Sequence, residues 1–353
     1  MTDKPKRFLF NAHNRRGLGH LMRGLNIARE IRNISNDADI LFYTRSESAT
    51  ELCGDQFDYF IEEDLEHNQH WASVIDHFQP DVVIYDTLLP KEAVDTPPCP
   101  GRTAYIMRKC KPDRQQEIFN HPFLASIDLI LIPHEPVEFG YSLPDAHITK
   151  ATFVGPIIRH AETQPQQMLR DKYKLQPGEF LLTSTVGGGG FEDKALAFFA
   201  TIFEIHQQIH TKIPKLRHLV IKGPNFTNSL PQLEGIEIID SETEMVNLLA
   251  ISNLVIAEGG YNTVNEIRLA KTPAIFLPSE RNYDDQRERV LELKDKGLAF
   301  VYTQNDGNLI AEQIVKLFSD KTLLTNLRHR YANDSILTGN RAAAQKLVAL
   351  ASI

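Results

Sequence analysis

Short apolar runs of strand length alternate with longer segments of helical periodicity along most of the chain. In the first half these runs cover residues 7–12, 38–44, 81–86, 102–107 and 128–133, with helical segments between them that include 20–33 and 69–79. A second series covers residues 179–186, 216–223, 236–240, 253–258 and 272–278. Parallel strands need a crossover connection, usually a helix, so this alternation is typical of parallel sheets covered by helices. We therefore predict an α/β fold.

A polar stretch rich in Pro and Gln, AETQPQQML at residues 161–169, separates the two series. A chain of 353 residues is long enough for two domains of ordinary size, each with its own core. We predict two doubly wound, Rossmann-like domains that face a cleft, over residues 1–160 and 161–335. Residues 336–353 are expected to form a terminal helix that packs back on the first domain.

Composition narrows the class of protein. The net charge of −8 argues against a nucleic-acid partner, since binding the phosphate backbone needs a positive surface. No apolar run approaches the roughly 20 residues of a membrane span, and the charged N-terminus leads directly into a strand. The three cysteines lack the paired spacing of a zinc site. We expect a cytoplasmic protein with free thiols.

One local cluster is basic, formed by Arg102, Arg108, Lys109, Lys111 and Arg114. Such a cluster could contact an anionic acceptor or, peripherally, a membrane surface. A solvated loop is the other interpretation.

Ligands of doubly wound sheets bind at the carboxyl ends of the strands, so the loops that follow strands are the first places to look. The first such loop, GLGHLMR, begins at Gly17 and contains Gly19 and His20. A dinucleotide fingerprint would place a third glycine where Met22 stands. His20 is expected near a helix start, where an imidazole can accept a proton at neutral pH. A simple helix cap is the alternative.

A second loop follows the first strand of the second series. It contains four consecutive glycines, Gly187, Gly188, Gly189 and Gly190. Glycines allow a ligand to approach the backbone closely and expose N–H groups to it. The spacing does not fit a P-loop, and a flexible connection between the domains is the alternative.

A third loop, IAEGGYNTVNE, places Gly259 and Gly260 between a strand and a helix that starts near Asn262 and Thr263. The N–H groups of such a helix start suit a diphosphate. Glu266, one turn further on, could accept hydrogen bonds from ribose hydroxyls or could serve the helix dipole alone. Downstream, Asp285 and Gln286 offer polar contacts to a sugar.

Taken together, GGYNTVNE followed by DDQRERV resembles the nucleotide-sugar site of GT-B glycosyltransferases, particularly glycosyltransferase family 28 and related predicted bacterial glycosyltransferases. The resemblance extends to GLGHLMRGLNIA, PDVVIYD, FVGPIIR and VGGGG, and so covers most of the chain. It implies a first domain that binds an acceptor and a second domain that binds a nucleotide sugar.

Carried over by position, the resemblance implies that Gly259, Gly260, Asn262 and Thr263 hold the diphosphate and that Glu266 binds the ribose. The loop from Gly187 to Gly190 would lie near the phosphates. Asp285 and Gln286 stand where the lipid I N-acetylglucosaminyltransferases of the family have two glutamines that contact the donor sugar. The change to Asp at the first of these positions leaves the donor sugar open.

On the acceptor side, the resemblance makes His20 the candidate base. We also expect Gly19, Arg23 and Arg108 to contact the acceptor. Asp86, directly after a predicted strand, could orient the imidazole or could cap the next helix. GHLMR also resembles the nucleotide-sugar hydrolases of pseudaminic acid synthesis, which transfer the sugar to water.

The expected function is therefore transfer of a sugar from a nucleoside diphosphate sugar, with UDP as the first candidate nucleotide, to a hydroxyl acceptor. We expect it to need no cofactor and no metal, because no Asp-x-Asp motif follows a predicted strand. Hydrolysis of the nucleotide sugar, or binding of it without turnover, are the alternatives.

Overall fold

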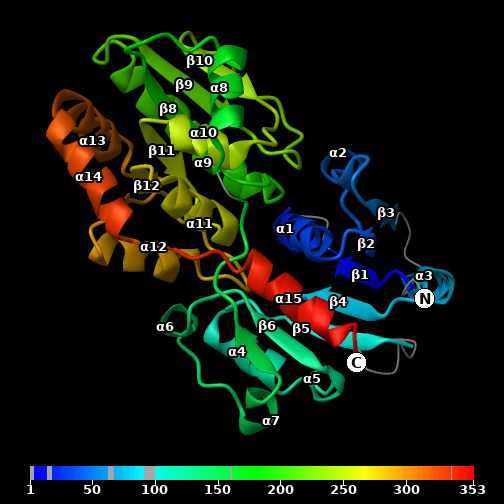
Figure 1. Cartoon of the computed structure of the whole chain (residues 1–353). Coiled ribbons are helices and arrows are strands. Elements are labelled where there is room, and N and C mark those ends of the chain that lie inside the picture. Colours follow the sequence, from blue (N-terminus) through cyan, green and yellow to red (C-terminus); the bar gives the residue numbers. More distant parts are fainter. Residues whose placement is uncertain (1–3, 14–17, 63–66, 91–99, 160, 335) are drawn as a thin grey trace. The chain divides into compact units, whose positions relative to one another are not determined.

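The chain folds into two compact units, each of which is described by itself. Unit 1 comprises residues 1–158 and 337–353, and unit 2 comprises residues 159–336. The computed structural model (Figure 1) describes residues 4–13, 18–62, 67–90, 100–159, 161–334 and 336–353. The predicted boundaries at residues 160 and 335 lie close to those of the two units.

Unit 1 is built on a seven-stranded parallel sheet with the order β3-β2-β1-β4-β5-β6-β7. Its strands are β1 (Arg7–Ala12), β2 (Asp39–Thr44), β3 (Asp58–Ile61), β4 (Val82–Asp86), β5 (Arg102–Ile106), β6 (Leu129–Ile132) and β7 (Ala151–Phe153). Its helices are α1 (Gly19–Ile34), α2 (Ala49–Cys53), α3 (His67–Phe78), α4 (Pro112–Phe119), α5 (Phe123–Ser126), α6 (Pro136–Phe139), α7 (Asp145–Ile148) and α15 (Asn340–Leu350).

Alternate residues of the central strands enter two different cores. Phe8 and Phe10 of β1 belong to a core shared with α1 and α15, whereas Leu9 between them belongs to a core shared with Trp71 of α3. Side chains of a strand point alternately to the two faces of a sheet, so a strand that is apolar throughout needs helices on both faces. The continuous apolar runs of β1 and β4 have this cause.

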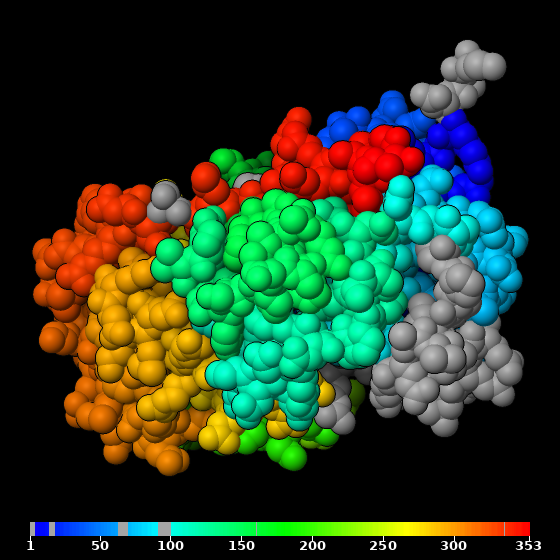
Figure 2. All heavy atoms as spheres, turned by 90° about the horizontal axis from the view of Figure 1, so that it is seen from below, coloured from blue at the N-terminus to red at the C-terminus, as the bar shows by residue number. Residues whose placement is uncertain are grey.

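The C-terminal helix α15 belongs to unit 1 although the whole of unit 2 precedes it in sequence. Ala343, Ala344 and Leu347 are fully buried in the same core as α1. Asn340 fixes the return of the chain, because its side chain accepts from the Ile158 amide and donates to the Ile158 carbonyl. Figures 1 and 2 both show this segment, in red, against the blue-to-green residues of unit 1.

Unit 2 has a six-stranded parallel sheet with the order β10-β9-β8-β11-β12-β13. Its strands are β8 (Phe180–Thr185), β9 (Leu216–Ile221), β10 (Ile236–Ile239), β11 (Leu254–Ala257), β12 (Ala274–Phe276) and β13 (Ala299–Val301). Its helices are α8 (Thr163–Lys172), α9 (Glu192–Ile209), α10 (Met245–Ile251), α11 (Tyr261–Ala270), α12 (Gln286–Asp295), α13 (Gly307–Ser319) and α14 (Lys321–Asn333).

The prediction of two doubly wound α/β sheets is confirmed, and it missed three strands. β3, β7 and β13 each lie at an edge of a sheet. β3 is largely exposed, and β7 and β13 have three residues each. An edge strand has a neighbour on one side only and needs no long apolar run, so its sequence carries little signal.

The strand order reverses between β1 and β4 in unit 1 and between β8 and β11 in unit 2. At such a switch point the connections leave to opposite faces of the sheet and open a crevice at the carboxyl ends of the strands, where ligands bind. The loops after β8 and β11 contain residues predicted to be functional, His20 lies at the start of the helix that follows β1, and the loop after β4 begins directly behind Asp86. The fold thus brings together, within each unit, residues that are far apart in sequence.

Candidate functional site

The switch point of unit 1 holds an imidazole–carboxylate pair. His20 is the second residue of α1 and Asp86 is the last residue of β4, and the His20 Nδ1 and Asp86 Oδ1 atoms are 3.0 Å apart. A carboxylate at Nδ1 favours the tautomer that carries its proton there and leaves Nε2 free to accept one. The His20 side chain is 12% exposed, so it retains limited access to solvent.

Arg23 lies behind this pair. Its Nε donates to Asp86 Oδ2 at 2.9 Å and its Nη2 donates to Asp86 Oδ1 at 2.6 Å. The Arg23 side chain is 2% exposed. We expected Arg23 to contact the acceptor, and the structure instead places its guanidinium on Asp86. The reason is helical geometry: Arg23 lies three residues after His20 and therefore shares its face of α1.

Asp86 is held in its ionised form. Burial alone would raise the pKa of its carboxyl, but Arg23 and His20 together hold this pKa well below the usual range. The next residue, Thr87, donates from Oγ1 to Asp86 and has a φ of +60°. A β-branched residue with positive φ is rare and strained, and such strain often accompanies functional sites.

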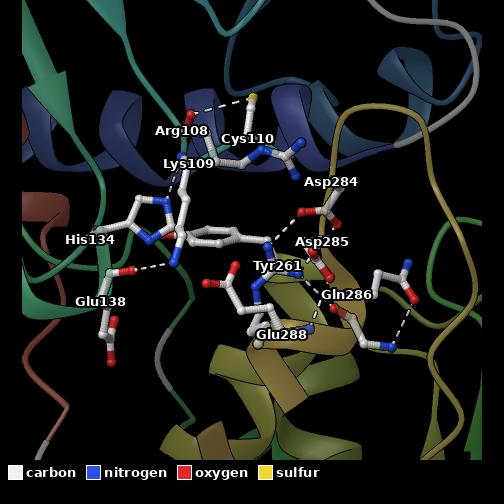
Figure 3. Close-up of polar contacts among 12 residues, drawn as sticks. Arg108, Lys109, Cys110, His134, Glu138, Tyr261, Asp284, Asp285, Gln286 and Glu288 are labelled. Carbon is white, nitrogen blue, oxygen red and sulfur yellow. Dashed lines mark hydrogen bonds and ion pairs between the residues drawn. The ribbon is translucent and has the colours of Figure 1, made fainter. Parts of the chain in front are cut away.

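The other predicted acceptor residues are less closely gathered. Gly19 begins α1, whereas Gly17 lies outside the described residues. Arg108 follows β5, the neighbour of β4, and is partly buried. Beside it, the Lys109 amide donates to His134 and the Lys109 Nζ donates to the Glu138 carbonyl (Figure 3).

The basic cluster predicted from the sequence is divided by β5. Arg102 begins this strand, whereas Arg108 and Lys109 follow its end, which separates them by about 20 Å of extended chain. Arg102 and Arg114 pair with Asp128 and Glu117 respectively. The five side chains therefore do not form one patch, because a strand and not a loop separates Arg102 from the other four.

Sequence reasoning missed a second imidazole–carboxylate pair in unit 1. Glu62, which follows β3, is 2% exposed and contacts the His13 Nε2 atom beyond the end of β1. The Tyr43 hydroxyl donates to Glu62 at 2.8 Å, and the Arg45 Nε atom lies 3.7 Å from it. His13 and Arg45 each follow a strand that the sequence predicts, but β3 itself gave no signal.

In unit 2 the first turn of α11 lies at the switch point. Gly260 is its N-cap, and the helix offers no carbonyl partner to the amides of Asn262 and Thr263 because these belong to its first turn. The loop after β8 runs alongside: a Cβ atom placed on Gly187 would lie 3.3 Å from Thr263 Oγ1. Gly187 and Gly189 have φ of +72° and +76°, which explains glycine at these two positions.

Two residues of this region differ from expectation. The Gly259 amide donates to Gln286 Oε1 at 3.1 Å, and the Ser279 amide donates to the same oxygen at 3.1 Å. The Gln286 side chain is 5% exposed. Gly259 therefore does not offer its amide to a ligand, and Gln286 fixes the β11–α11 turn instead of presenting its oxygen to a sugar. A side chain at position 259 would collide with Val290 and Gln286.

Glu266 lies in the middle of α11 and is partly buried. Burial raises the pKa of its carboxyl to about 7, and among the residues that the structure describes no charged or hydrogen-bonding neighbour opposes this rise. It lies beyond the first turn, so a role limited to the helix dipole does not explain it. A carboxyl without a partner can be stabilised by a ligand that supplies hydroxyl donors.

Asp285 caps α12, since its side chain accepts from the Glu288 amide at 2.9 Å. The preceding residue, Asp284, pairs with Arg289 at 2.5 Å, and Arg289 also donates to the Gly259 carbonyl at 2.7 Å. Figure 3 shows Asp284, Asp285, Gln286 and Glu288 together at the start of this helix. The polar run of the sequence thus serves first to fix the start of α12 next to the β11–α11 turn.

Comparison with protein families matches residues 186–344 to the glycosyltransferase family 28 C-terminal domain. This segment contains the glycine loop after β8, the whole of α11 and the start of α12. The match therefore covers every donor-side residue predicted from the sequence.

Curated relatives are distant. The chain is 25% identical over 169 residues to the UDP-N-acetylglucosamine–N-acetylmuramyl-(pentapeptide) pyrophosphoryl-undecaprenol N-acetylglucosamine transferase of Wolbachia pipientis subsp. Culex pipiens, covering 45% of this chain and 49% of that protein. It is 25% identical over 194 residues to an uncharacterized glycosyltransferase of Methanopyrus kandleri, covering 53% and 52%. The chain thus spans about half the length of the curated relatives it matches.

Among solved structures, the spinosyn forosaminyltransferase aligns over 99% of this chain and 100% of its own, with a TM-score of 0.68 and 12% identity. At this level of identity the likeness concerns the fold. The fold is that of the GT-B glycosyltransferases, as the sequence resemblance implied.

Proposed function

We propose that this chain, whose residues 186–344 match the glycosyltransferase family 28 C-terminal domain, moves a sugar from a nucleoside diphosphate sugar to a hydroxyl acceptor. In this proposal unit 2 binds the donor and unit 1 supplies the base. The curated relative from Wolbachia pipientis, by its name, uses UDP-N-acetylglucosamine, which makes UDP the first nucleotide to test.

The observation that carries the proposal is the β11–α11 junction. Its first-turn amides at Asn262 and Thr263 lie beside the glycine loop after β8. Glu266 lies further along the same helix, and within the described part of the chain no partner stabilises its charge. Amides at a helix N-terminus bind phosphate oxygens, and a carboxylate binds vicinal ribose hydroxyls. A nucleoside diphosphate presents both groups.

The proposed reaction assigns one task to each of these groups. His20 Nε2 takes the proton of the acceptor hydroxyl, whose oxygen then forms a bond to the anomeric carbon of the sugar. The bond between that carbon and the diphosphate breaks, and the diphosphate leaves with the electron pair. The amides of α11 stabilise the charge that grows on it, while Asp86 stabilises the imidazolium.

Binding is the first test. Thermal shift measurements with UDP, TDP and GDP should raise the melting temperature of the wild type with at least one of them. Glu266→Ala should weaken this effect, whereas His20→Ala should retain it. If no nucleoside diphosphate stabilises the protein, the proposal is wrong.

Turnover is the second test. Purified protein is incubated with nucleotide sugars, with and without hydroxyl acceptors, and the products are separated by chromatography. Release of nucleotide only when acceptor is present indicates transfer, whereas free sugar without acceptor indicates the hydrolase that GHLMR also resembles. His20→Ala should lose turnover, and His77→Ala, an exposed histidine of the same unit, should not.

A further inference from the structure

A buried ion pair lies at the carboxyl edge of the unit 2 sheet and has no role in the site described so far. Glu258 directly follows β11, and Arg281 belongs to the segment that follows the neighbouring strand β12. The Arg281 Nη2 and Glu258 Oε2 atoms are 2.6 Å apart, and the two side chains are 11% and 3% exposed.

Each partner retains an atom without a hydrogen bond. Glu258 Oε1 and Arg281 Nη1 are both shielded from solvent, and neither has a hydrogen-bond partner within the described ranges. Burial raises the pKa of Glu258, and the opposing effects of Arg281, Ser279 and Gln286 do not outweigh it. A buried polar atom without a partner is unfavourable, so such atoms in a native site call for an explanation.

The surroundings of the pair connect it to the predicted donor site. Glu258 immediately precedes Gly259, whose carbonyl and amide are fixed by Arg289 and Gln286. The Arg281 guanidinium stacks 4.1 Å from the centre of the Phe191 ring, at the end of the glycine loop after β8. The loops after β8, β11 and β12 therefore meet at this pair, next to the first turn of α11.

We infer that Glu258 and Arg281 form a subsite for a neutral polar group of the donor sugar, a pair of hydroxyls or an acetamido group. This inference rests on the proposed function. The two unused atoms are one acceptor and one donor. A carboxylate or phosphate would be repelled by Glu258, and an ammonium group would be repelled by Arg281. Vicinal hydroxyls, or an amide, can donate to Oε1 and accept from Nη1 at once.

The test compares nucleotide with nucleotide sugar by isothermal titration calorimetry of the full chain. The probes are UDP, UDP-glucose and UDP-N-acetylglucosamine, or the matching compounds of TDP or GDP if these give the larger thermal shift. Glu258→Gln and Arg281→Met should each weaken binding of the nucleotide sugar about tenfold relative to binding of the nucleotide. Affinity for the nucleotide alone should stay within about twofold of the wild type.

The matched control is Asp334→Asn, which makes the same carboxylate-to-amide change in the ion pair with Arg268 elsewhere in unit 2. It should leave both affinities unchanged, and circular dichroism should show that all variants are folded. If the Glu258 and Arg281 variants lose nucleotide and nucleotide sugar equally, the pair acts on the diphosphate and the inference is overturned. Unchanged affinities overturn it as well. Failure of the wild type to bind any nucleotide would refute the proposed function itself.

Discussion

Glu266 should make unit 2 less stable at the pH where it is ionised. Its carboxyl has a pKa of about 7 in the folded chain and an ordinary value of 4.5 when solvated. Below pH 4.5 the group is protonated in both states and has no effect. Between pH 4.5 and 7 the unfolded chain ionises first, so stability falls as the pH rises, and above pH 7 the loss is complete.

The magnitude follows from the same two values. One pKa unit corresponds to about 1.36 kcal/mol. The difference between 4.5 and about 7 therefore lowers the free energy of unfolding by about 3 kcal/mol at pH 8 and by less than about 1 kcal/mol at pH 5. Glu266→Gln removes the ionisable group with little change of shape. The free energy of unfolding should therefore rise by about 3 kcal/mol at pH 8 and by little at pH 5.

Urea denaturation followed by circular dichroism at pH 5, 7 and 8 measures this difference. Glu312→Gln on the exposed side of α13 is the control and should change stability equally little at each pH. The same Glu266→Gln change should weaken nucleoside diphosphate binding about tenfold, since a hydrogen bond to a charged group is stronger than one to an amide. If the gain in stability of Glu266→Gln over wild type is no larger at pH 8 than at pH 5, the reasoning about burial is refuted.

Three further changes test other parts of the structure. Asp86→Asn leaves the buried Arg23 without its counter-charge and should lower the free energy of unfolding of unit 1 by about 3–5 kcal/mol. Urea denaturation followed by the fluorescence of Trp71 measures this loss, and no loss would mean that the ion pair is not formed. Burial lowers the pKa of His218 to about 3, so below pH 6.5 the unfolded chain takes up a proton before the folded chain does. The free energy of unfolding should therefore be about 2 kcal/mol lower at pH 5 than at pH 7, and His218→Asn should remove this difference. Gly259→Ala should displace the start of α12, because its Cβ would lie 2.8 Å from Val290, and should lower the melting temperature by several degrees, whereas an unchanged melting temperature would contradict the close packing.

The sequence predicted most of the two sheets because their central strands are apolar on both faces. β1, β4 and β11 each contain a continuous apolar run, and β8 begins with one and continues with buried hydroxyl residues, since helices cover both sides of each sheet. The same rule fails for the edge strands β3 and β13, which need no such runs. Several residues that follow the central strands, such as Gly187 and Gly260, were accordingly found, whereas Glu62, which follows an edge strand, was not.

Side-chain roles were harder to predict than positions. Contact between His20 and Asp86 was one of two alternatives for Asp86, beside a helix cap; the structure shows this contact, while the catalytic roles remain proposals. Arg23, Gln286 and Asp285 were expected to face substrates, yet each is engaged within the protein. A polar residue after a strand can serve either purpose, and the sequence pattern is the same in both cases.

By itself the sequence determined which segments become buried strands, where glycine permits sharp turns, and hence which loops lie at the carboxyl edges of the sheets. Hydrophobic periodicity and backbone sterics act locally, so a single chain records them. Only the tertiary structure decided which of the polar groups at those edges bind one another and which keep an unused donor or acceptor. That distinction, as at Glu258 and Arg281, depends on distances of a few tenths of an ångström between loops that are far apart in the chain.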